Sequence, residues 1–343
     1  MSALLSRLGW DETWAAAART APSANPDARP GRVVRADRGG CLVQTAAGPE
    51  QVALGLRLDP PPTTGDWVLV DRTGTVAAVL PRRTAVVRGA GRRDARGQLL
   101  AANVDVLFVV AALSEAPNLS RLERLLALAW ESGATPVVLL TKADLSVDVS
   151  SERAEVAGAA LGADVIAVSV LDGQGLDEVK QYLLPGRTGA LIGASGTGKS
   201  SLVNALAGEE ILATRDIRDD GKGRHTSTAR ELIVLPWGAV LLDTPGLRGV
   251  QLWDANEGVE RTFADIELLA AECRFTDCGH ADEPGCAITA AVTDGRLTAR
   301  RLASYRKLQR EQAWLAGRYD ARLRAEQRRV WKLRVKEGRQ RAR

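Results

Sequence analysis

The chain has 343 residues, 45% of them hydrophobic, and a formal net charge of +4, so two or three domains with buried cores are expected. Its longest apolar run, Val104 to Leu113, is too short to span a membrane, and its start does not resemble a signal peptide. We therefore predict a cytoplasmic protein with no membrane partner. Residues 322–343 carry ten Lys or Arg against two Glu, which predicts a polyanionic partner for this tail, with a solvated helix end as the alternative.

The N-terminal part contains five short β-like segments separated by clusters of Gly, Pro and Asp. Five short strands in fewer than sixty residues predict a small barrel. We expect an OB-fold over residues 31–88, although an SH3-like barrel would give the same pattern. Residues 1–30 end in a Pro-rich polar stretch and are expected to form a flexible leader. The Arg- and Gly-rich residues 89–103 are expected to form a mobile linker. The five segments span residues 31–37, 40–46, 51–57, 66–72 and 75–81.

Strand-like and helix-like segments alternate over residues 104–250. A buried strand over 104–113 precedes an amphipathic helix over 119–133, and a strand with a loop follows over 135–145. This alternation predicts an α/β domain with a parallel sheet and helices on both faces. Residues 251–320 form a charged helical domain around one Cys/His cluster, and residues 321–343 form the basic tail. The whole chain is thus predicted to be a multidomain α/β protein.

A phosphate-binding loop is predicted where the apolar strand ALIGA runs into a glycine-rich segment and then a helix. Residues 193–200 match GxxxxGK[ST] in full. Glycines let backbone N–H groups surround phosphates, and the helix N-terminus adds partial positive charge. We expect Lys199 to reach the β- and γ-phosphates and Ser200 to ligate Mg²⁺, with an ordinary Gly-rich turn as the alternative. The predicted phosphate-loop residues are Gly193, Ala194, Ser195, Gly196, Thr197, Gly198, Lys199, Ser200 and Ser201.

A base-reading motif follows the strand PVVLL, where TKAD at residues 141–144 resembles the [NT]KxD motif of GTPases. A buried carboxylate at Asp144 can accept hydrogen bonds from guanine N1–H and the exocyclic amine, a pair of donors that adenine lacks. Lys142 is expected to lie along the base through its aliphatic stem. Thr141 stands where most GTPases have Asn, but its hydroxyl can still tether the loop. The predicted guanine-binding residues are Thr141, Lys142, Asp144, Ser169 and Val170, the last two through backbone groups near guanine O6.

The segment DTPG at residues 243–246 follows the apolar strand AVLLD and matches the DxxG motif. Asp243 is expected to hold Mg²⁺ through water, and the Gly246 N–H to meet the γ-phosphate. The charged, Gly-containing segment between the phosphate loop and this motif is predicted to be mobile until nucleotide orders it. The candidate hydroxyls for the Mg²⁺ shell in that segment are Thr226, Ser227 and Thr228.

The group that positions the attacking water is predicted to be His225. Leu247 occupies the place where many GTPases carry a catalytic Gln, and an apolar side chain cannot orient water. His225 is the only histidine outside the Cys/His cluster, so we assign it this role, with a solvated loop histidine as the alternative. Gly196 stands where potassium-activated GTPases carry Asn, so no strong potassium requirement is expected.

A metal site is predicted from three cysteines and one histidine spaced C-x4-C-x-H-x5-C. Three thiolates and an imidazole suit tetrahedral Zn²⁺, and four protein ligands leave no open position, so the site is expected to be structural. Buried thiols without metal are the alternative. Cys41 lies apart and is expected to be a small core residue. The predicted zinc ligands are Cys273, Cys278, His280 and Cys286.

The order of the motifs is that of a circularly permuted GTPase, because the guanine motifs precede the phosphate loop. With ANVD at 102–105, GKGRHTSTARELI and the Cys/His spacing, the chain resembles the RsgA-type GTPases, which depend on the small ribosomal subunit, over about residues 31–320. The resemblance implies GTP hydrolysis to GDP and phosphate, stimulated by that subunit late in its maturation near the decoding region, with release of assembly factors. It also implies a catalytic role for His225. The family usually shows three Thr after this His, so Thr-Ser-Thr here leaves the Mg²⁺ hydroxyl open.

Other functions are weighed against this one. The chain could be an RNA-binding module that uses GTP as a switch, because the barrel, zinc domain and basic tail all suit rRNA. A GTPase of large-subunit assembly is disfavoured by the barrel and the Cys/His cluster, and an ATP-using kinase or ATPase by Asp144. We expect a monomer. Since the DxxG motif leads straight into the C-terminal domain, movement of the switches is expected to be passed to that domain.

Overall fold

The computed structural model describes residues 2–21, 27–37, 39–55, 58–89, 97–212, 231–243, 255–281 and 283–319.

The N-terminal barrel is closed. Five strands pair in the order β1-β2-β3-β5-β4, and β1 pairs with both β2 and β4. With its parallel β3–β5 pair, this is the five-stranded Greek-key arrangement of an OB-fold, so the predicted barrel is confirmed. The strands are β1 (Arg29–Ala36), β2 (Gly40–Thr45), β3 (Gly48–Leu54), β4 (Trp67–Val70) and β5 (Thr75–Val79).

The barrel interior is filled mainly by valines from all five strands. Side chains of successive strand residues point to opposite faces, so alternate positions meet inside. Cys41 is 1% exposed in this cluster, as expected for a small core residue. The other buried members are Val33, Val43, Val52, Val68, Val70 and Val76.

The prediction of a flexible leader over residues 1–30 is wrong for its first two-thirds. Helices α1 (Ala3–Arg7) and α2 (Glu12–Thr20) precede the barrel, and the Asp11 carboxylate caps α2 by accepting from Trp14 N at 2.9 Å. Trp10 and Trp14 are buried, and the Trp10 ring meets that of Trp67 on the barrel with centroids 4.8 Å apart. The Pro-rich end of this segment predicted flexibility, whereas the indoles of Trp10 and Trp14 hold the two helices against Trp67 of the barrel.

A buried arginine joins the N-terminal helices, the barrel and the start of the central domain. The Arg32 guanidinium donates to the backbone carbonyls of Leu8, Gly65 and Asn103 and lies over the Trp67 ring. Burial lowers the pKa of Arg32 to about 10, which still leaves it cationic at neutral pH. Its three hydrogen bonds offset the cost of burying this charge and fix how the barrel sits on the central domain.

The expected linker is partly a strand. β6 (Ala85–Arg88) and β7 (Gln98–Ala102) form an antiparallel pair that runs from Ala85 opposite Ala102 to Arg88 opposite Gln98, with a register shift between Val86 and Val87. Residues 90–96, the Arg- and Gly-rich centre of the expected linker, lie outside the described residues. The prediction of a mobile linker is therefore wrong for residues 98–102.

The central domain is built on a six-stranded sheet in the order β10-β9-β8-β11-β13-β12. The pairs along β10-β9-β8-β11-β13 are parallel, which confirms the predicted parallel sheet. β12 adds an antiparallel edge next to β13, which the sequence did not reveal. The strands are β8 (Val106–Ala112), β9 (Thr135–Thr141), β10 (Asp164–Val168), β11 (Thr188–Gly193), β12 (Glu231–Val234) and β13 (Val240–Asp243).

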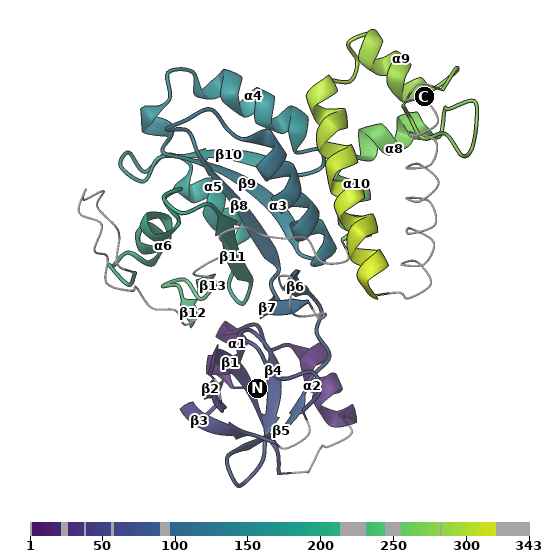
Figure 1. Ribbon diagram of the computed structural model, residues 1–343. Coiled ribbons are helices and arrows are strands. Elements are labelled where there is room, and N and C mark those ends of the chain that lie inside the picture. The colour runs from purple at the N-terminus through teal and green to yellow at the C-terminus, as the bar shows by residue number, and fades with distance from the viewer. Residues whose placement is uncertain are drawn as a thin grey trace, which may run out of the picture.

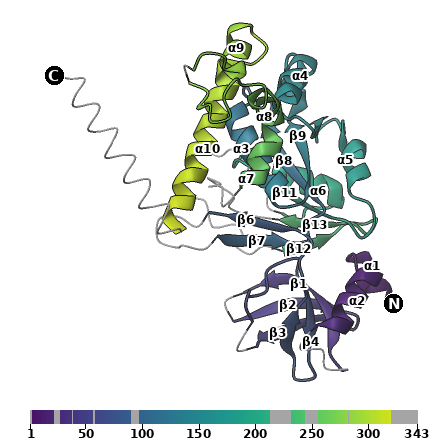
Figure 2. The ribbon, with the colours of Figure 1, turned by 90° about the vertical axis from the view of Figure 1, so that its right-hand side faces the viewer.

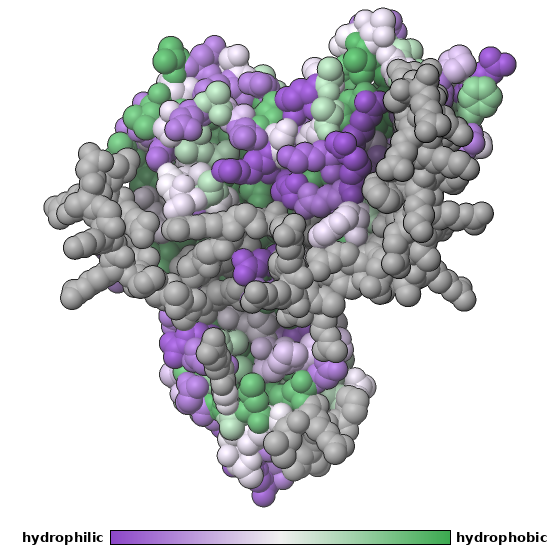
Figure 3. All heavy atoms as spheres, in the orientation of Figure 1, coloured by the Kyte–Doolittle hydropathy of each residue, from purple (hydrophilic) through white to green (hydrophobic). Residues whose placement is uncertain are grey.

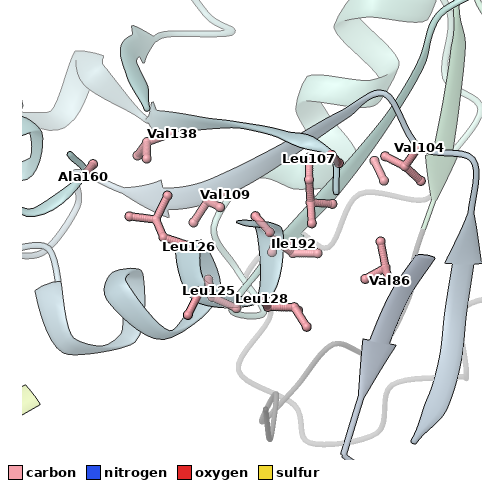
Figure 4. Packing of buried hydrophobic residues seen from close by; sticks show 14 of the residues in the cluster. Val86, Val104, Leu107, Val109, Leu125, Leu126, Leu128, Val138, Ala160 and Ile192 are labelled. Atoms are coloured by element: carbon pink, nitrogen blue, oxygen red, sulfur yellow. The ribbon is translucent and has the colours of Figure 1, made fainter. Parts of the chain in front are cut away.

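Helices cover both faces of this sheet, as predicted. Leu107 and Val109 of β8 belong to the core that packs under α3 (Leu119–Glu131) and α4 (Val149–Ala159). Val106 and Phe108, which alternate with them along β8, belong to a second core on the other face, under α5 (Leu176–Tyr182) and α6 (Lys199–Ala207). Figure 4 shows Leu126 of α3 beside Val109 of the sheet. A strand buried on both faces explains the continuous apolar runs in the sequence.

The C-terminal domain is helical and packs on α3 (Figures 1 and 2). A Cβ on Gly258 would lie 2.0 Å from the Ala127 carbonyl oxygen, so only glycine allows α7 to approach α3 this closely. The domain contains α7 (Asn256–Thr262), α8 (Ala264–Ala270), α9 (Ala287–Thr293) and α10 (Ala299–Tyr319). Within the described ranges, no helix combines the length and apolar character needed to cross a membrane.

Ion pairs join α10 to α3. Glu123 of α3 is fully buried and accepts from both Arg300 and Arg301 at 3.0 Å. Arg301 is 5% exposed and also donates to Asp265 of α8 at 2.7 Å. Figure 3 shows hydrophilic side chains gathered over α10 and the adjoining α3. The central and C-terminal domains are therefore held together by charge as well as by close helix packing.

Candidate nucleotide-binding site and metal centre

The predicted nucleotide-binding motifs meet at one edge of the central sheet. β9, β10, β11 and β13 run parallel, so their carboxyl ends point the same way. Thr141, Ser169, Gly193 and Asp243 stand at or directly after these four ends. Open α/β sheets bind ligands in the crevice beyond the carboxyl ends of their strands. The topology therefore brings together motifs that lie more than a hundred residues apart in the chain.

The phosphate loop leaves β11 and enters α6 as the sequence predicted. Gly193 has a φ of 159°, and a Cβ at this position would lie 2.4 Å from the Val110 carbonyl oxygen. No side chain fits there, so glycine lets the loop turn tightly over β8. Ser195 and Gly196 are exposed on the loop, whereas Ser200 and Ser201 are half-buried in the first turn of α6. The loop thus has the strand–turn–helix geometry of an anion site.

Lys199 lies across this loop. Its ammonium group donates to the carbonyl oxygens of Gly193, at 3.0 Å, and Ala194. The Thr197 hydroxyl also donates to Ala194 O, at 2.9 Å. These contacts hold the lysine charge over the concave side of the loop, where the phosphates of a nucleotide are expected to bind.

The guanine loop is attached to the phosphate loop through Thr141. Its hydroxyl lies 2.6 Å from the Thr197 carbonyl oxygen and 3.2 Å from that of Ala111. Thr141 is 2% exposed, so this contact is shielded from water. The hydroxyl has one proton and donates it to the nearer acceptor, the Thr197 carbonyl oxygen. This hydrogen bond joins two motifs that are 56 residues apart. The expected tether is present, and its partner is the phosphate loop itself.

Asp144 departs from the expectation of a buried carboxylate. It lies in the short 3₁₀ helix Ala143–Leu145 at the surface and is exposed. Lys142 precedes it with a φ of 58° and is half-buried. The 3₁₀ turn carries the Asp144 side chain outward, because it projects beyond the end of β9 instead of back into the sheet. A carboxylate there can meet an incoming base at the surface.

Ser169 contributes more than the backbone contact expected of it. It is fully buried at the end of β10, and its hydroxyl lies 2.9 Å from Asp144 Oδ1. The same hydroxyl lies 3.1 Å from Asp172 Oδ2, a residue that the sequence reasoning did not single out. Val170 is half-buried beside it. A serine directly after an apolar strand, three residues before an aspartate, is the signal that could have predicted this pair of contacts.

Several predicted residues cannot be placed. His225, Thr226, Ser227, Thr228 and Gly246 lie outside the described residues. The backbone of Asp243 ends β13 and pairs with Glu231 of β12. The assignments of the water-positioning group, the Mg²⁺ hydroxyl and the γ-phosphate contact stay predictions.

The four predicted metal ligands come together in the C-terminal domain. One ligand atom from each of Cys273, Cys278, His280 and Cys286 lies within 4.8 Å of the others. Cys273 Sγ lies 3.9 Å from Cys286 Sγ and 3.5 Å from His280 Nδ1. Two sulfurs on one tetrahedral zinc, each about 2.3 Å from the metal, lie about 3.8 Å apart. The cluster therefore has the donor set and spacing to hold one metal ion.

The surroundings of the cluster favour thiolate at Cys286 and hold the shape of the site. At Cys278 the hydrogen bond from the His280 N–H lowers the pKa, but desolvation and the neighbouring thiols of Cys286 and Cys273 outweigh it and raise the pKa to about 11. Burial acts to raise the pKa of the Cys286 thiol, but hydrogen bonds from Thr289 and the neighbouring ligands lower it to about 6. Arg306 of α10 donates to the backbone carbonyl of His280, which has a φ of 55°. The thiolate is the form that binds metal, so this position is prepared for a cation.

Removing the metal should expose thiols selectively. After treatment with a chelator, a thiol reagent should react quickly with the three cluster cysteines, because thiolates released from a metal are nucleophilic. Cys41 should stay protected, since it is 1% exposed and burial raises its pKa to about 11. The measurement is a thiol titration of native protein with and without chelator, with denatured protein as the reference for all four cysteines. Equal reactivity with and without chelator would argue against a bound metal.

Comparison with known sequences agrees with this architecture. The family model described as RsgA GTPase matches residues 79–253. A Streptomyces avermitilis protein named Small ribosomal subunit biogenesis GTPase RsgA is 50% identical over 343 residues, covering 96% of this chain and 91% of its own. A protein of the same name from Opitutus terrae is 44% identical, covering 96% of this chain and 95% of its own.

Solved structures also resemble this chain in fold. YjeQ from Thermotoga maritima matches with a TM-score of 0.60 and 26% identity, over 83% of this chain and 98% of its own. YloQ, described as a circularly permuted GTPase, matches with a TM-score of 0.57 and 23% identity, over 83% of this chain and 95% of its own, which supports the fold. The permuted order predicted from the motifs is confirmed. With a barrel, a permuted P-loop domain and a Cys/His cluster in the same order, this chain belongs to the RsgA GTPase family.

Proposed function

We propose that this protein hydrolyses GTP to GDP and phosphate and acts in biogenesis of the small ribosomal subunit. The observation that carries the catalytic part is the 2.6 Å contact from Thr141 to Thr197, which holds the guanine loop and the phosphate loop together at one sheet edge. The ribosomal part is supported by a relative that is 50% identical and named for small-subunit biogenesis. Such a protein would work in the cytoplasm, where subunits are assembled.

Five described residues of the nucleotide site have assigned roles in this proposal. Lys199 binds the β- and γ-phosphates together with the loop N–H groups, while Asp144 and Ser169 select guanine. We assign Mg²⁺ binding to Ser200, in the first turn of α6, and to Asp243, the last residue of β13, and the ion would neutralise charge on the phosphates. Zinc is the metal we propose for the Cys/His cluster, because three thiolates and an imidazole within 4.8 Å suit it better than a harder cation.

Replacing His225 with alanine should lower GTP turnover strongly while leaving GTP affinity nearly unchanged. The imidazole is proposed to orient the attacking water, and general acid–base groups of this kind contribute about 10²- to 10⁴-fold. Single-turnover hydrolysis measured beside binding of a non-hydrolysable GTP analogue separates the two effects. Unchanged turnover would remove His225 from the mechanism.

The decisive experiment on function is GTP hydrolysis with and without purified small ribosomal subunits, with large subunits as the control. Selective stimulation by small subunits is the expected result. Stimulation by large subunits instead would indicate a role in assembly of that subunit. Nucleotide-dependent binding without any stimulation would favour an RNA-binding protein that uses GTP as a switch.

A further inference from the structure

Two carboxylates compete for one hydroxyl beside the predicted guanine site. The Ser169 hydroxyl lies 2.9 Å from Asp144 Oδ1 and 3.1 Å from Asp172 Oδ2. The Asp172 N–H donates to the same oxygen at 3.2 Å, which fixes the turn between β10 and α5. Ser169 is fully buried, whereas both carboxylates are exposed.

A serine hydroxyl has a single proton, so it can donate to only one of the two carboxylates at a time. When the proton points to Asp172, both oxygens of Asp144 keep their lone pairs for a ligand. Two like charges around one hydroxyl also repel each other, and nearby N–H donors relieve that repulsion. The arrangement therefore favours a base whose edge carries hydrogen-bond donors.

We propose that Asp172 is a specificity-determining residue that strengthens the preference for guanine. Its carboxylate gives the Ser169 proton a second acceptor besides Asp144 and adds a second negative charge near the donor edge of the base. Guanine presents N1–H and an amine at that edge. Xanthine presents a carbonyl oxygen in place of the amine, and hypoxanthine lacks the amine. This inference rests on the proposed role of Asp144 as the guanine reader.

The test is the replacement Asp172→Asn, which removes the charge but keeps an oxygen that can accept from Ser169. Affinity for fluorescent GDP should fall about 3- to 10-fold, the range expected for one partly solvated charge. Affinity for the inosine diphosphate should fall less, and that for xanthosine diphosphate should stay the same or rise. The loss for GDP should shrink at high salt, because screening weakens the lost charge interaction.

A matched control is Asp177→Asn on α5, where the side chain is 91% exposed and paired with Lys180 at 2.7 Å. It removes the same charge from a neighbouring element and should leave all three affinities nearly unchanged. If Asp172→Asn weakens the three diphosphates equally, or none of them, the inference is overturned. If Asp144→Asn keeps the preference for GDP over xanthosine diphosphate, the proposed guanine site fails, and the inference fails with it.

Discussion

Replacing Lys199 with alanine is expected to weaken binding of GTP and GDP by about 100-fold or more and to abolish measurable turnover. The reason is geometric: its ammonium group is held over the phosphate loop by the carbonyl oxygens of Gly193 and Ala194. Loss of one partner from a close charge pair costs about 2–5 kcal/mol, and the phosphates would keep only the backbone N–H groups. Titration with a fluorescent GDP analogue and steady-state GTP hydrolysis would measure both losses.

The control for this variant is Lys180→Ala. Lys180 lies on α5, is 43% exposed and is paired with Asp177, so its loss removes the same charge without touching the loop. Its nucleotide affinity should match that of the unmodified protein. Tight GDP binding by Lys199→Ala would show that the phosphates lie elsewhere.

Replacing Glu123 with alanine is expected to destabilise the protein by about 3–5 kcal/mol, because it removes the buried carboxylate that Arg300 and Arg301 share. Glu123 is fully buried and accepts from both Arg300 and Arg301. Asp265 would still pair with Arg301, so the domain interface should loosen before the rest of the fold. Chemical denaturation followed by circular dichroism gives the loss in the free energy of unfolding.

Two further variants make this result interpretable. Glu123→Gln keeps one oxygen that can accept from an arginine and should give a smaller loss. Glu257→Ala breaks an exposed pair, 3.5 Å from Arg261 with the glutamate 70% exposed, and should cost at most about 1 kcal/mol. If Glu123→Ala costs no more than Glu257→Ala, the buried pair does not stabilise the interface.

Features coded by neighbouring residues could be predicted from the sequence. The phosphate loop needs a strand, glycines and a helix in direct succession, and all three stand between residues 188 and 207. The barrel strands are short β-like segments separated by Gly, Pro and Asp clusters, a pattern that the local sequence shows directly. The metal cluster is contained within fourteen residues, so its spacing alone gave the donor set.

Features that depend on distant pairing could not be predicted. Arg301 and Glu123 are 178 residues apart, and nothing local marks either of them as buried. The antiparallel direction of β12 depends on where β13 lies, and the packing of the N-terminal helices depends on Trp67 of the barrel. The exposure of Asp144 follows from the turn after β9 and not from its motif.

Closure of the barrel limits how it can meet another molecule. β1 pairs with both of its neighbours, and a short parallel contact of Ala53 and Leu54 with β5 completes the ring, so only parts of β3 and β5 keep an unpaired edge among the described strands. This leaves a partner little edge on which to add a strand. Contacts made by the barrel would then go mainly through side chains and loops, which leaves its surface free to diverge while the valine interior keeps the fold.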